Sequence, residues 1–193
     1  MLKNPQDRRA RRTAMQIKET MLSFLERKSV HEISVSEICK VCQINRATFY
    51  DHYRDVFDLV QDLERDVLLL LEELMTRVSP EETPAEEVSR LFFDFLEENR
   101  RALKLLLGSE RSREFSGCLD GILMPFFERK IRQNYRIPAG KERELHLAMR
   151  FVSSGYYRFF MEAIEDSSGR EAEAALCARL SDACLETLFE RRT

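Results

Sequence analysis

Residues 36–53 read SEICKVCQINRATFYDHY, and this stretch predicts two short helices joined by a tight turn. Asn45 stands where it can cap the second helix, because its side chain can accept a hydrogen bond from a free backbone amide of the first turn. The apolar residues that recur at helical spacing, and that we expect to be buried, are Val35, Ile38, Val41, Ile44, Phe49 and Tyr53.

The other side of the second helix is left to solvent. It combines a cation, a methyl group, hydroxyls and an imidazole, on Arg46, Ala47, Thr48, Tyr50 and His52. A guanidinium can bind a guanine edge, an alanine can contact a thymine methyl group, and hydroxyls can bind phosphate oxygens. We therefore expect a helix-turn-helix that binds double-stranded DNA, with Ser36 and Arg54 completing the DNA-binding set. The alternative is a helix pair that serves only packing.

The flanking sequence favours the DNA-binding interpretation. An amphipathic segment precedes the pair and carries Ala14, Ile17, Met21, Leu22, Phe24 and Leu25. A basic arm of Arg8, Arg9, Arg11 and Arg12 precedes that segment. Over roughly residues 10–64 the chain resembles the TetR family of transcriptional regulators, most specifically in TFYDHY with SEIC before it and DVFDLV after it.

Three positions depart from the family pattern. Gln43 stands where the turn usually has glycine, so a left-handed backbone there would be strained. Val56 replaces a lysine that often binds phosphate, which leaves Arg54 as the nearest substitute. Asp51 would be repelled by phosphate unless it accepts from a cytosine amino group. These departures keep a second hypothesis open, in which the chain is a TetR-like co-regulator or adaptor that acts mainly through a protein partner.

The charge distribution supports the motif. The formal net charge is −3, from 31 basic and 34 acidic residues. Up to Tyr53, however, ten basic residues outnumber six acidic ones, so this part carries +4 and the remainder −7. A cationic N-terminal region on an acidic body concentrates the attraction to phosphate at one end.

Several other classes of protein are disfavoured. The longest aliphatic run, Val67–Leu71, is far shorter than the roughly 20 residues of a membrane-spanning helix. The charged N-terminus lacks the apolar stretch of a signal peptide, so we expect a cytoplasmic protein. No catalytic triad, glycine-rich phosphate loop or metal-ligand spacing is present, and His31, His52 and His146 are far apart. We therefore expect neither an enzyme nor a cofactor.

The five cysteines form no regular disulfide framework. Cys39 and Cys42 form a Cys-x-x-Cys, which is compatible with half a zinc site or a redox pair. No second pair stands at zinc-finger spacing, so we favour packing over a metal. Cys177 and Cys184, seven residues apart, are expected to be small buried side chains.

The rest of the chain predicts an all-α fold, with a DNA-binding domain over residues 1–55 and a helical domain over residues 56–193. Two prolines interrupt the pattern between Ser79 and Pro84, where Thr83 can cap a helix that has Pro84 at its first position. Pro125 should bend the helix that contains it. The expected helices are Val56–Val78, Pro84 to about Leu96, Asn99–Leu107, about Arg113 to the early 130s, Lys141–Ile164 and Arg170–Arg192, with a loop at 135–140.

The last two helices carry apolar residues on more than one side, and one monomer needs only a single stripe. They include Leu145, Leu147, Ala148 and Phe151, then Leu176, Leu180, Ala183 and Leu188, with small residues Ala174, Ala178 and Ser181 that would allow close approach. The resemblance implies a homodimer that pairs these helices with those of a second copy. It also implies a pocket for a small, largely apolar ligand, although the aromatic residues beyond position 90 equally suit a plain core.

Overall fold

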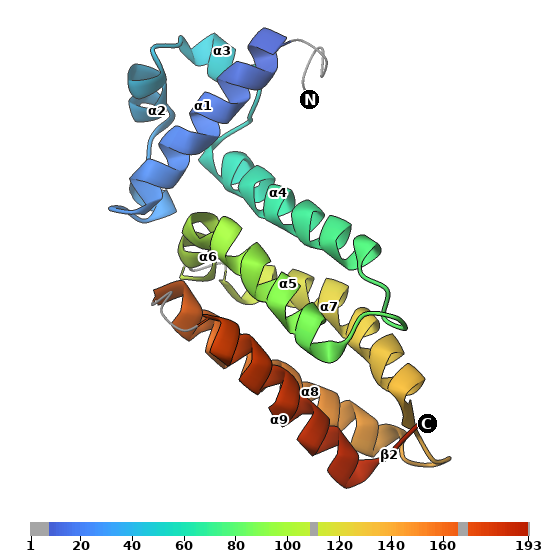
Figure 1. The fold of residues 1–193 in the computed structure, drawn as a ribbon. Helices are drawn as coiled ribbons and strands as arrows, with labels where there is room; N and C mark the ends of the chain where they lie inside the picture. Colours follow the sequence, from blue (N-terminus) through green and yellow to red (C-terminus); the bar gives the residue numbers. More distant parts are fainter. Residues whose placement is uncertain (1–7, 109–111, 166–169, 193) are drawn as a thin grey trace. The chain divides into compact units, whose positions relative to one another are not determined.

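The computed structural model describes residues 8–108, 112–165 and 170–192, and almost all of these are helical, which confirms the all-α prediction (Figure 1). The helices are α1 (Arg8–Leu25), α2 (Val35–Cys42), α3 (Arg46–Tyr50), α4 (Val56–Arg77), α5 (Ala85–Glu98), α6 (Arg100–Leu107), α7 (Ser112–Asn134), α8 (Glu142–Glu165) and α9 (Arg170–Leu188). A 3-10 turn, η1 (Val30–Glu32), and two short strands, β1 (Tyr135–Arg136) and β2 (Glu190–Arg191), complete the described elements.

The described residues form two compact units. The first comprises those up to Val67 together with those within Lys104–Phe115, and the second comprises Leu68–Leu103 and those from Ser116 onward. The helix α4 contributes to both. The division expected from the sequence, between residues 55 and 56, separates the motif from this helix, whereas the packing units divide within it.

In the first unit, α1 contacts α2 and α2 contacts α3. Its core is closed by five side chains with no exposed surface, Ile17, Met21, Ile38, Phe49 and Leu59. Burial of such side chains is worth about 1.5–3 kcal/mol each, so the three short helices are held mainly by packing.

Side-chain caps set the helix starts in this unit. Ser34 and Glu37 form a reciprocal capping box at the start of α2. Asp55 accepts from the amide of Asp58 at 2.8 Å, which confirms it as a cap of α4. The basic arm was expected to precede the first helix, but Arg8 through Arg12 form its opening turns.

The prediction for Val41 was wrong. Its side chain is 56% exposed, while Cys42, one residue later, is buried. Val41 and Cys42 are three and four residues after Ile38, so either could lie on the same side of the helix. Contacts with α1 bury Cys42 and leave Val41 exposed. The Cys42 sulfur lies 3.2 Å from the Thr20 hydroxyl and 3.7 Å from the carbonyl oxygen of Gln16.

In the second unit, α5 contacts both α8 and α9, and α8 contacts α9 (Figure 1). One buried cluster joins the end of α7 to α8 and α9, and consists of Ile131, Tyr135, Leu145, Ala148, Met149, Leu185 and Phe189. The helix α7 contains Pro125, as expected. Thr83 was expected to cap α5, but Pro84 occupies the cap position and the helix begins at Ala85.

The end of the chain also differs from its prediction. The last helix stops at Leu188, and β2 then pairs antiparallel with β1, so that Tyr135 lies opposite Arg191. The amide of Arg192 donates to the carbonyl oxygen of Asn134 at 2.7 Å. This ladder ties the end of α9 to the segment that was expected to be a loop.

The two apolar stripes of α8 and α9 are both present. Leu145 and Ala148 are buried in the second unit, whereas Leu147, Phe151 and Tyr157 on α8 and Leu176, Leu180 and Leu188 on α9 are exposed. Ala174 and Ala178, which were expected at a close approach of helices, are buried within this unit. No helix in the described part of the chain is long and apolar enough to cross a membrane.

Candidate nucleic-acid interface

The turn between α2 and α3 depends on Gln43. Its φ of 54° and ψ of 41° are left-handed, as predicted for the position that usually holds glycine. The amide of Ile44 then donates to the carbonyl oxygen of Cys39 at 3.0 Å, which satisfies a group at the end of α2. The side chain of Gln43 makes this conformation costly, and it is retained because it directs the chain into α3.

The orientation of α3 is determined at both ends. The Asn45 side-chain oxygen accepts from the Thr48 amide at 2.7 Å and from the Thr48 hydroxyl at 3.0 Å, which confirms the cap. Phe49 is fully buried, and the Tyr53 hydroxyl donates to Asp62 of α4 at 3.1 Å. Burial and the adjacent carboxylate of Asp62 raise the pKa of Tyr53, so this hydroxyl keeps its proton.

Four of the predicted DNA-binding residues lie exposed on α2 and α3: Ser36, Arg46, Ala47 and Tyr50. The guanidinium of Arg46 donates a hydrogen bond to the Ser36 hydroxyl, so the turn brings together two residues that are ten positions apart. This contact holds the Arg46 side chain along the surface of the helix pair. Thr48 is half-buried, and its hydroxyl proton is already donated to Asn45.

His52 differs from its prediction. It follows α3 in a turn instead of lying on the helix, and its side chain is half-buried. Burial lowers the pKa of His52, so the ring is neutral near pH 7 and adds no positive charge to the DNA-facing surface. Its Nδ1 atom is buried without a hydrogen-bond partner in the described structure.

Arg54 is exposed, and it forms an ion pair with Asp58, a residue that was not among the predicted site residues. Its backbone amide donates to Asp58 at 2.9 Å, and its guanidinium donates to the same carboxylate at 3.2 Å. Both bonds lower the pKa of Asp58, and the bond from the backbone amide of Arg54 has the larger effect. The sequence did indicate a role for Asp58, because it lies in the first turn of α4, where carboxylates are favoured.

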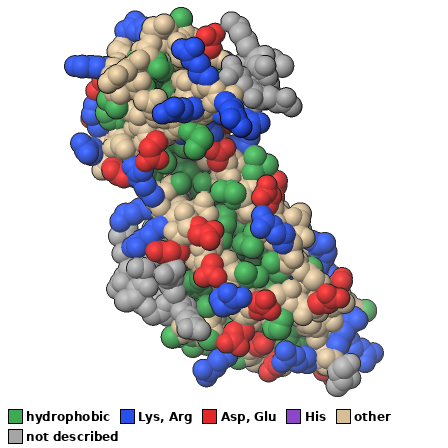
Figure 2. Space-filling view, turned by 45° about the horizontal axis from the view of Figure 1, so that its top comes forward, with side chains coloured by type: hydrophobic (Ala, Val, Ile, Leu, Met, Phe, Trp, Pro, Cys, Tyr) green, Lys and Arg blue, Asp and Glu red, His purple; other side chains and the backbone are tan. Residues whose placement is uncertain are grey.

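The arginines at the start of α1 are exposed, and Figure 2 shows Lys and Arg side chains spread over this unit at the top of the view. Further along α1, Lys18 contacts Asp62 at 2.7 Å and Asp66 at 2.5 Å. Lys18 therefore binds α1 to α4, while the arginines remain on the surface.

Cys39 and Cys42 are buried, free thiols. Burial raises the pKa of Cys39, which keeps the thiol protonated and makes it a poor metal ligand. No group of potential metal ligands occurs in the described residues. The burial of both thiols fits the expected packing role.

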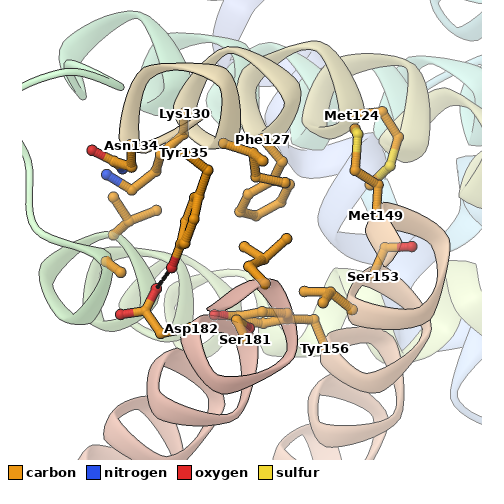
Figure 3. Close-up of a pocket in the computed structure, with 15 residues that line it drawn as sticks. Met124, Phe127, Lys130, Asn134, Tyr135, Met149, Ser153, Tyr156, Ser181 and Asp182 are labelled. Carbon is orange, nitrogen blue, oxygen red and sulfur yellow. Dashed lines mark hydrogen bonds between the residues drawn. The ribbon is translucent and has the colours of Figure 1, made fainter. Parts of the chain in front are cut away.

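The second unit contains a cavity of about 60 Å³ among α5, α7, α8 and α9. Most of its wall is apolar, and it includes Val88, Met124, Phe127, Met149, Val152 and Leu185. Figure 3 shows Lys130, Asn134 and Tyr135 above Asp182, with the Tyr135 hydroxyl donating to this carboxylate at 3.1 Å. The Ser89 and Tyr156 hydroxyls are 2.9 Å apart and form a hydrogen bond.

No family model matches the sequence. An uncharacterised HTH-type transcriptional regulator of Bacillus subtilis, YxbF, is 33% identical over 86 residues, which are 44% of this chain but only 23% of that protein.

Solved structures match far more of the chain. A TetR-family regulator from Streptomyces coelicolor has a TM-score of 0.67 and 17% identity, over 92% of this chain and 82% of that one. The dihydroxyacetone kinase operon activator DhaS has a TM-score of 0.60 and 18% identity, over 92% and 98% of the two chains. The helix order, the helix-turn-helix and these matches agree: the chain has the fold of the TetR-family regulators.

Proposed function

We propose that this chain is a DNA-binding transcriptional repressor, which acts as a homodimer on a palindromic operator and responds to a small ligand. The observation that carries the proposal is the exposed face of α3, which presents Arg46, Ala47 and Tyr50 on a helix anchored by Phe49 and Asn45.

The expected roles follow from the chemistry of these side chains. Arg46 forks onto a guanine edge and Ala47 contacts a thymine methyl group. The Tyr50 hydroxyl binds phosphate, as does Arg54 once its guanidinium leaves Asp58. Thr48 and Ser36 lie near Arg46 and approach the sugar-phosphate backbone of the DNA. His52 contributes contact area without charge.

The homodimer is supported by the exposed stripes of α8 and α9. Phe151 is 73% exposed and Leu180 is 52% exposed, and large apolar side chains left exposed on both helices are typical of an interaction surface. A two-fold dimer of these helices would carry two motif units, which matches an operator with half-sites about 34–36 Å apart.

Ligand response is supported by the apolar cavity of the second unit and by α4, which contributes to both units. A ligand alters DNA binding only if it favours one arrangement of the protein over another. Linkage then requires operator DNA to weaken ligand binding by the same factor. A ligand that binds equally tightly with and without operator would contradict this part of the proposal.

The direct test is selection of duplexes from a random library by the full chain, followed by competition with random duplex at several salt concentrations. We expect a palindromic site that outcompetes random duplex, with affinity falling steeply as salt increases. A reporter placed behind the selected site should be more active without the regulator. Binding without sequence preference would instead favour the adaptor hypothesis.

A further inference from the structure

Lys130 is a buried cation beside the cavity of the second unit. It lies on α7 with only 8% of its surface exposed. Its ammonium group donates to the carbonyl oxygen of Pro80 at 3.3 Å and to that of Thr83 at 2.5 Å. In the described part of the chain no carboxylate lies within 4.0 Å of this group.

This arrangement leaves the charge of Lys130 incompletely compensated. Burying an ammonium group is costly unless an opposite charge is close, and two neutral carbonyls replace only part of its hydration. Burial accordingly lowers the pKa of Lys130. Most lysines avoid this cost by extending to the surface, so its position requires an explanation.

The nearest acidic group on the cavity wall is committed elsewhere. Asp182 accepts from the Tyr135 hydroxyl at 3.1 Å and lies 3.8 Å from the guanidinium of Arg191. Asp182 attracts Lys130, but it also contacts Tyr135 and Arg191, and burial still lowers the pKa of Lys130, so Asp182 compensates this cation only in part. This end of the cavity therefore holds a buried cation whose charge is only partly compensated.

The cavity is polar at this end and apolar at the other. In Figure 3, Lys130 and Asn134 lie together on one side, while Met124 and Met149 lie on the opposite side. Its volume of about 60 Å³ holds on the order of four water-sized groups, so it suits a short molecule better than a long one.

We propose that the cavity binds a small amphiphile with a carboxylate head group, which pairs with Lys130. The head group accepts from the ammonium of Lys130 and the side-chain amide of Asn134, and the apolar part lies among Met124, Phe127 and Met149. This inference rests on the proposed ligand response, for which it names the chemical class of the ligand.

Two other roles for these residues make different predictions. If Lys130 serves only to bind the carbonyls of Pro80 and Thr83, the cavity should bind uncharged amphiphiles as well as carboxylates. If Asp182 determines the ligand, an amine should bind best. Three probes with the same three-carbon chain, short enough for the cavity, separate these cases: propionate, 1-propanol and propylamine.

The experiment is calorimetric titration of each probe into the full chain without DNA. We expect propionate to bind about tenfold more tightly than 1-propanol, because charge-assisted hydrogen bonds are roughly twice as strong as neutral ones, and propylamine to bind least. In Lys130→Met the preference of propionate over 1-propanol should shrink to about twofold or less. The matched control is Lys141→Met, an exposed lysine of the same unit, which should keep the wild-type preference.

Equal binding of propionate and 1-propanol to the unaltered chain, tighter binding of propylamine, or no binding of any probe would overturn the proposal. These outcomes need no variant, so they count even if Lys130→Met fails to fold. Operator selection is measured separately and without probe. The ligand class can therefore fail while DNA binding stands, and the reverse also holds.

Discussion

The two units of the molecule differ in how completely their polar and apolar groups are satisfied within one chain. In the first unit, Lys18 is matched by Asp62 and Asp66, the Tyr53 hydroxyl by Asp62, and the start of α3 by Asn45, while the buried Nδ1 atom of His52 is an exception among its described groups. In the second unit, Lys130 has only carbonyl partners, and a row of large apolar side chains on α8 and α9 is exposed.

From this difference we infer that the two units have different roles. The first unit presents a surface whose geometry is set before any partner arrives, which reduces the cost of ordering it on binding. The second unit has two features that a partner would complete, an apolar face and a buried cation. Changes in the first unit should therefore alter recognition or stability, and changes in the second should alter assembly or ligand binding.

The largest effect is expected for Leu180→Glu. In a dimer through α8 and α9 this carboxylate would be buried without a partner, which costs about 3–5 kcal/mol and weakens the dimer roughly 100- to 4,000-fold. Sedimentation should show helical monomers. Leu70→Glu is the matched control, since Leu70 of α4 is similarly exposed, at 47% against 52% for Leu180. If Leu180→Glu sediments as the unaltered protein does, the interface lies elsewhere.

Arg46→Ala tests the first unit and should have the next largest effect. Loss of a bidentate base contact costs about 1–3 kcal/mol and relaxes preference at one operator position. Tyr50→Phe, which removes only a phosphate contact, should weaken binding to all sequences alike. Fluorescence anisotropy with single-base operator variants distinguishes the two. Unchanged affinity and selectivity in Arg46→Ala would mean that α3 does not read bases.

The helices were predictable from the sequence because their limits are encoded locally. Asn45 and Asp55 cap helices, and Pro125 was expected within a helix. The β1 and β2 pair was not predictable, because two residues per strand show no periodicity and the paired residues are 54 and 56 positions apart. Thr83 was misassigned because Pro84 can occupy either the cap or the first helical position.

Which residues form the candidate sites was easier to predict from the sequence than how deeply those residues are buried. The turn and the exposure of Arg46 followed from the spacing of the motif, and the left-handed Gln43 followed from the resemblance to a glycine position. The burial of His52 and Lys130 did not, since both types usually reach solvent and only tertiary contacts enclose them. The pairing of Arg54 with Asp58 was not predicted, because an exposed arginine beside a DNA-binding helix can equally extend to phosphate.

A smaller effect is expected for Asn45→Ala, which removes the cap of α3. The amide of Thr48 then loses its acceptor, and stability should fall by about 0.5–2 kcal/mol. Urea unfolding at a fixed protein concentration measures this loss. Asn45→Asp keeps an acceptor at the same place and should retain most of the stability while its charge weakens DNA binding. Equal destabilisation by both substitutions would show that the cap bond is not the cause.

The smallest effect, of opposite sign, is expected for Gln43→Gly. A left-handed conformation costs an L-residue about 1–2 kcal/mol, and glycine avoids this cost but is more flexible when unfolded. The net result should be a gain of about 0.5–1 kcal/mol in the free energy of unfolding. Lys40→Gly is the control, because Lys40 is an exposed helical residue of α2 where glycine should cost about 1 kcal/mol. If both glycines destabilise the protein, the side chain of Gln43 contributes contacts that outweigh its strain. If only Gln43→Gly stabilises it and operator affinity is unchanged, the strain is incidental to recognition, and the first unit is preorganised by its caps and core alone.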